Sequence, residues 1–144
     1  MRRLAWPSVL PWGLAVVLGW PAWLLAAERL TIGQLHQYHA SYHTRVVTVV
    51  GKVEDMQAFP PMRVATARCN TLYGRAQFLL IDETGSLSVE SVGSCFPAAM
   101  TLPHDGDQIE LTAMILVYVP DGQTAQVMKA ITHKIVVLQE HTEE

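Results

Sequence analysis

The sequence lacks the motifs on which most enzymatic chemistry depends. No serine or cysteine stands in a nucleophile motif, no glycine-rich stretch forms a phosphate-binding loop, and the haem-attachment motif C-x-x-C-H is missing. The adjacent acidic pairs Glu54-Asp55 and Asp82-Glu83 stand at predicted strand ends, where turn formation and solubility explain them. We therefore expect a protein that is not an enzyme and has no cofactor.

Charged side chains are few, and their balance is acidic. The chain of 144 residues has ten Lys and Arg against thirteen Asp and Glu, a net charge of −3. Without residues 1–27, which contain Arg2 and Arg3, eight basic side chains face thirteen acidic ones, and the net charge is −5. Nucleic-acid binding normally calls for a strongly basic face. The composition therefore disfavours a nucleic-acid partner.

Half of the residues are hydrophobic, and many of them lie at the N-terminus. Arg2 and Arg3 precede an apolar run from Leu4 to Leu25, which ends at Ala26-Ala27-Glu28. This order is typical of a secretory signal peptide over residues 1–27 and predicts a periplasmic or secreted protein. The alternative is an uncleaved anchor, because about 20 apolar residues can span a bilayer. Only in that case do we expect a membrane contact.

The length of the chain favours one domain. Residues 28–44 are expected to contain a short helix that begins after Thr31 and continues to about His43. Its buried stripe is predicted from residues at helical spacing: Ile32, Leu35, Tyr38 and Tyr42. Residues 45–139 form the main domain, and 140–144 a flexible tail.

Alternating and β-branched residues predict strands in the main domain. Arg45 to Val53 reads as one strand, with Gly51 at a bend, and Ala76 to Val92 as a hairpin that turns at Glu83–Ser86. A second hairpin is predicted from Gln108–Val119 and Val127–Leu138. The core is expected to contain Phe78, Leu87, Val89, Ile109, Leu111 and Ile131.

Three segments of the chain carry a resemblance to a known family. VTVVGKV, GRAQFLLIDETGSLSVES and LPHDGDQIELTAMILV resemble the OB-fold family of the tRNA-anticodon-binding type, and exported bacterial OB-fold domains share the barrel. The resemblance covers about residues 45–138 and implies an all-β, five-stranded OB-fold barrel. The family's helix between strands three and four is reduced here to SCFPAAMTLP.

The only two cysteines, Cys69 and Cys95, flank the central hairpin. One precedes its first strand and the other follows its second, so the hairpin brings both to its open end. Because an exported protein can be oxidised, we predict a disulfide between them.

An OB barrel binds its ligand on strands two and three and on the flanking loops, which are Phe59–Arg75 and Pro120–Gln126 in this chain. The first loop carries the candidate ligand-binding residues Phe59, Arg63, Arg68, Tyr73 and Arg75. A cationic and aromatic mixture suits a carboxylate, an acidic protein surface or a single-stranded nucleic acid. Alternatively, the arginines only keep a long loop soluble. With the acidic net charge, we expect a protein or a small anionic molecule as the partner.

Two further functions remain open: a periplasmic metal or haem carrier, and a single-stranded nucleic-acid binder. His36, His39 and His43 lie three and four residues apart on one predicted helix face, where imidazoles could hold a metal. The methionines are too scattered to resemble those of exported copper chaperones. His133 and His141 lie outside the haem-binding motif of the haem chaperones.

Overall fold

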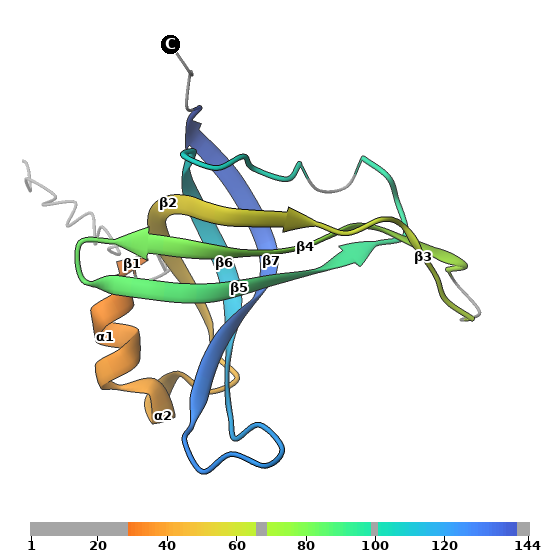
Figure 1. The fold of residues 1–144 in the computed structure, drawn as a ribbon. Coiled ribbons are helices and arrows are strands. Elements are labelled where there is room, and N and C mark those ends of the chain that lie inside the picture. The colour runs from red at the N-terminus through yellow and green to blue at the C-terminus, as the bar shows by residue number, and fades with distance from the viewer. Residues whose placement is uncertain (1–28, 66–68, 99–100, 141–144) are drawn as a thin grey trace, which may run out of the picture.

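The computed structural model describes residues 29–65, 69–98 and 101–140. The predicted signal peptide, residues 1–27, lies outside the described residues. Figure 1 shows a barrel of long strands with short helices at one end. The elements are β1 (Arg29–Leu30), α1 (Ile32–Gln37), α2 (His39–Tyr42), β2 (Val46–Ala58), β3 (Met62–Arg63), β4 (Thr71–Asp82), β5 (Gly85–Ser94), β6 (Gln108–Tyr118) and β7 (Val127–Gln139).

Five long strands close into a barrel. Their order is β2-β6-β7-β5-β4, and β4 returns to pair with β2. All of these pairings are antiparallel except the short one between β5 and β7, which joins Ser88–Glu90 to Lys129–Ile131. This is the order of an OB-fold, so the predicted five-stranded barrel is confirmed.

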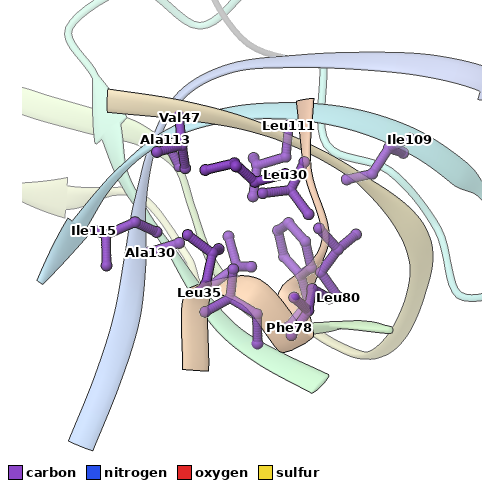
Figure 2. Close-up of a cluster of buried hydrophobic side chains, with 14 of the residues drawn as sticks. Leu30, Leu35, Val47, Phe78, Leu80, Ile109, Leu111, Ala113, Ile115 and Ala130 are labelled. Atoms are coloured by element: carbon purple, nitrogen blue, oxygen red, sulfur yellow. The ribbon is translucent and has the colours of Figure 1, made fainter. Parts of the chain in front are cut away.

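The helix α1 closes one end of the barrel. Thr31 caps it in a reciprocal arrangement with Gln34, and the carboxylate of Asp82 accepts the Ile32 N–H at 2.8 Å. Ile32 and Leu35 are fully buried, and Figure 2 shows Leu35 within the cluster of side chains from the strands. The helix breaks at Tyr38, which is 52% exposed, so the predicted stripe is wrong at that position.

The interior of the barrel follows the alternation of each strand. Five of the six predicted core residues are buried there: Phe78, Leu87, Val89, Ile109 and Leu111. The sixth prediction, Ile131, is wrong because its neighbours Ala130 and Thr132 point inward. The pairing of β6 with β7 shifts just beyond Thr132, and Ile135 and Val137 then pack against the core.

β2, the first strand of the barrel, and β4, the first strand of the hairpin, are both longer than predicted. β2 continues to Ala58, and its pairing with β4 is irregular between Glu54 and Gln57. The pair Glu54-Asp55 therefore lies inside this strand, with Asp55 at φ 53°, and not at the strand's end. Gly51 lies at the bend: a Cβ there would stand 2.7 Å from the Ile81 carbonyl oxygen.

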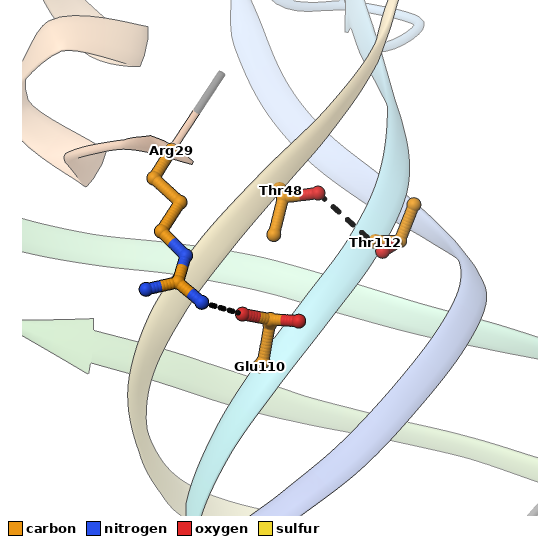
Figure 3. A network of polar contacts seen from close by, with 4 residues as sticks. All are labelled: Arg29, Thr48, Glu110 and Thr112. Atoms are coloured by element: carbon orange, nitrogen blue, oxygen red, sulfur yellow. Dashed lines mark hydrogen bonds and ion pairs between the residues drawn. The ribbon is translucent and has the colours of Figure 1, made fainter. Parts of the chain in front are cut away.

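β1 pairs in parallel with β2, and polar side chains join β1 to β6 and β2 to β6. Arg29 forms an ion pair with Glu110 at 2.8 Å, and the hydroxyls of Thr48 and Thr112 are 3.5 Å apart (Figure 3). Neither α1 nor α2 is long enough to cross a membrane, and this holds for every helix in the described ranges.

Candidate functional site

The predicted binding residues that the structure describes lie on strands or directly after one. Tyr73 and Arg75 lie on β4, which begins at Thr71, so their prediction as loop residues is wrong. The arms of the hairpin continue to the pair Tyr73–Ser94, because β2 and β3 flank β4 and supply further hydrogen bonds. Arg63 lies on β3, and Arg68 is outside the described residues.

Phe59 and Arg75 are in direct contact. The Phe59 N–H donates to the Arg75 carbonyl oxygen at 2.8 Å, which continues the pairing of β2 with β4. The Arg75 guanidinium carbon lies 5.6 Å from the centroid of the Phe59 ring, a cation–π geometry. Phe59 remains 37% exposed, so the ring still offers area to a flat ligand.

The strand register places more side chains beside this pair. On β4, Tyr73, Arg75 and Gln77 alternate with inward residues such as Ala76 and Phe78. Opposite them on β5 are Ser94, the half-exposed Val92, and Glu90. We call this surface the outer face; its members are Phe59, Tyr73, Arg75, Gln77, Glu90 and Val92.

A second cation–aromatic pair borders the outer face on the other side of β5. The Lys129 ammonium lies 5.4 Å from the centroid of the Tyr118 ring and 2.7 Å from a carboxylate oxygen of Glu90. The hydrogen bond from Lys129 to Glu90 and the charge of that carboxylate raise the pKa of Lys129 against the opposing effect of burial. Lys129 is therefore charged throughout the physiological range.

The two cation–aromatic pairs are spaced for an extended ligand. Arg75 lies opposite Val92 on β5, and Lys129 lies opposite Ser88. Four residues along a strand and two strand spacings separate these positions by about 16 Å. Sequence reasoning missed Lys129, Tyr118 and Glu90, because the parallel contact of β5 with β7 joins segments that no local pattern connects.

The disulfide lies at the open end of the hairpin. Cys69 and Cys95 are bonded, with their Cα atoms 5.6 Å apart, so the predicted disulfide is confirmed. It joins the segment before β4 to the segment after β5, next to the pair Tyr73–Ser94. A disulfide of this kind indicates an oxidising, non-cytoplasmic location.

The three helical histidines bind different partners. His36 Nε2 lies 2.8 Å from the Ser86 carbonyl oxygen, His39 Nε2 lies 3.0 Å from the Gln126 amide oxygen, and His43 Nδ1 accepts the Val117 N–H at 3.0 Å. Within the described residues, no three His, Cys, Asp or Glu side chains are placed to hold a metal ion. Of the two histidines weighed for haem, His133 is exposed on β7 and His141 is outside the described residues.

Comparisons with known proteins bear on the fold. No family model and no curated protein matches the sequence. An aspartyl-tRNA synthetase from Entamoeba histolytica matches 99% of this chain at 11% identity and a TM-score of 0.59, and this chain covers 27% of it. The second OB-fold domain of replication protein A from Methanococcus maripaludis matches 81% of this chain at 14% identity and a TM-score of 0.50, and it is covered entirely. At these identities the likeness shows the OB-fold.

The expectation about the partner is wrong. We expected a protein or a small anionic ligand and disfavoured nucleic acid, whereas the similar structures are a tRNA synthetase and a replication protein A domain. The error came from treating net charge as a property of every surface. The outer face and its border carry Arg75 and Lys129 against a single acidic side chain, Glu90, which already forms an ion pair.

Proposed function

We propose that this protein binds single-stranded nucleic acid on the outer face and has no catalytic activity. The observation that carries the proposal is the pair Phe59–Arg75, an exposed ring held against a guanidinium on the strands where OB folds bind oligonucleotides. Bases stack on such rings whatever their sequence, and the cation attracts phosphate.

The surroundings of the pair suit an extended strand. Val92 offers exposed apolar area opposite Arg75, and Gln77 adds an exposed amide. Lys129 and Tyr118 repeat the cation–aromatic combination about 16 Å away. A strand of a few nucleotides would cross β4 and β5 between the two pairs.

The test measures the fluorescence anisotropy of a labelled oligothymidine and of an oligouridine with the full-length oxidised chain. We expect Phe59→Ala and Arg75→Ala each to weaken binding by roughly 5- to 100-fold, the range for losing one stacked base. Arg45→Ala is the matched control, because Arg45 is an exposed arginine just before the opposite end of β2. Absence of binding by the unaltered chain, or equal affinities of Arg75→Ala and Arg45→Ala, would reject the proposal.

The proposal includes a periplasmic or secreted location. The disulfide and the apolar run from Leu4 to Leu25 support it together. N-terminal sequencing of the protein from its native host is expected to give a chain beginning at or near Glu28. Recovery of the intact chain from the cytoplasmic fraction would contradict the location without affecting the binding test.

A further inference from the structure

A groove lies between the helices and the β6–β7 loop. Its larger part, about 360 Å³, is lined by His36, His39, Val117, Gln126, Val127 and Met128. A neighbouring hollow of about 230 Å³ shares three of these residues and adds Ala40 and His43. We call the two together the helix–loop groove. The outer face does not include any of these residues.

Hydrogen bonds fix the chemistry of the groove walls. His36 Nε2 lies against the Ser86 carbonyl oxygen and must donate to it, so Nδ1 is an acceptor in the neutral tautomer. His43 Nδ1 accepts the Val117 N–H, which leaves Nε2–H as a donor. His39 bridges the His36 carbonyl oxygen and the Gln126 amide, at 3.1 and 3.0 Å. The walls therefore contain flat rings with both donors and acceptors.

The remaining lining is apolar, from Val117, Val127 and Met128. Among the described residues, no carboxylate, lysine or arginine lines either part, so this lining does not suit a bare phosphate or a cation. A flat heterocycle with polar edges meets these conditions, because imidazoles and methionine contact its faces while amide and ring nitrogens reach its edge.

The groove adjoins the border of the outer face. Met128 precedes Lys129, and Val117 precedes Tyr118, so the groove lining and the second cation–aromatic pair lie on opposite faces of the same end of β6 and β7. The β6–β7 ladder ends at the pair Tyr118–Val127, and Val127 lines the groove. A strand that leaves the outer face past Lys129 would therefore pass round this end of the β6–β7 ladder to reach the groove.

We propose that the helix–loop groove is a nucleobase subsite, which takes a base of the same strand beyond the nucleotides on the outer face. This inference rests on the proposed function. It predicts two classes of contact: the outer face serves every bound strand, whereas the groove serves only strands long enough to reach it.

The test compares labelled oligothymidines of 4 and 12 nucleotides on the full-length oxidised chain. Ala40→Trp places a bulky side chain in the groove, and Ala98→Trp adds the same bulk at an exposed position after β5. We expect Ala40→Trp to weaken binding of the 12-nucleotide strand about fivefold or more and to leave the 4-nucleotide strand unchanged. Phe59→Ala is expected to weaken both.

A second variant and a second readout guard against misfolding. Gln126→Ala removes the partner of His39 on an exposed loop and is expected to act in the same length-dependent way. The imidazole C–H resonances of His36 and His39 are expected to shift with the 12-nucleotide strand and not with the shorter one. If Ala40→Trp and Gln126→Ala match Ala98→Trp at both lengths, the groove proposal fails while the outer face stands. If no strand binds the unaltered chain, the proposed function fails first.

Discussion

The β4–β5 hairpin has two halves that are held in different ways. The turn half, residues 78–89, points Phe78, Leu80, Leu87 and Val89 into the barrel, and its turn is fixed to α1 by hydrogen bonds. The open half, residues 71–77 and 90–94, ends in a disulfide and exposes the outer face.

The difference separates stability from binding along one pair of strands. At the turn, Asp82 accepts hydrogen bonds from the Ile32, Thr84 and Gly85 N–H groups and from the Thr84 hydroxyl, so its oxygens are committed to the fold. In the open half Val92 keeps exposed apolar area, and so does Phe59, which packs against Arg75 of that half. Substitutions in the first half should change the free energy of unfolding, and those in the second should change affinity.

The largest expected effect comes from removing the disulfide. The bond closes a loop of 26 residues in sequence separation, which corresponds to about 3–4 kcal/mol of unfolding free energy on the chain-entropy model. We expect Cys69→Ser with Cys95→Ser to lower the midpoint of denaturant unfolding and to speed amide hydrogen exchange first in residues 71–77. Equal loss of protection at the turn half would contradict the division.

Loss of the Asp82 carboxylate should have the next largest effect. Asp82→Asn keeps the shape of the side chain, but its amide group can accept on one side only, so either the Ile32 N–H or the Thr84 and Gly85 donors lose their partner. We expect a loss of about 2 kcal/mol in chemical denaturation. Glu83→Gln, at an exposed neighbouring position, is the control and should be nearly neutral. If Asp82→Asn leaves the free energy of unfolding unchanged, α1 docks by its apolar contacts alone.

Acid should weaken the same contact. Burial alone would raise the pKa of Asp82, but hydrogen bonds from Ile32, Thr84 and Gly85 outweigh it and hold the pKa below its ordinary value of 3.8. Because the pKa is lowered in the folded state, the ionised carboxylate stabilises the fold at pH values above the ordinary pKa. That contribution to the free energy of unfolding is lost as the pH falls below the ordinary pKa. The stability difference between the unaltered chain and Asp82→Asn is therefore expected to be constant near neutrality and to shrink below about pH 4. A difference that stays constant down to pH 2 would contradict this.

The sequence predicted the barrel because local signals agree with the fold. Alternation and β-branching mark the strands, and the glycine at position 51 marks the bend. The core prediction is wrong at Ile131, because a shift in the β6–β7 register reverses the alternation of inward and outward residues and leaves no trace in local composition. The prediction of one continuous helix is wrong at Tyr38, where the chain turns from α1 into α2.

The site was predicted only in part. Phe59 and Arg75 stand sixteen positions apart, and composition marked both as candidates, but their contact depends on the pairing of β2 with β4. Lys129 and Tyr118 had no sequence signal, since their place beside Glu90 follows from barrel closure between β5 and β7. Net charge misled the partner prediction because it averages over surfaces that differ.

Glu90→Gln is expected to change stability least. It is also the sharpest test of the division between a turn half that stabilises the fold and an open half that binds. The pair of Glu90 with Lys129 is about one-third exposed on both sides, and such pairs contribute below about 1 kcal/mol. The substitution removes the single carboxylate of the outer face and leaves Lys129 free to meet a phosphate. We therefore expect tighter binding of single strands and a plot of log affinity against log salt that is steeper by about 0.7, the value for one more phosphate contact. Lys129→Gln should make the slope shallower or leave it unchanged. If Glu90→Gln weakens binding, Lys129 serves the fold by its pairing, and the outer face ends at β5.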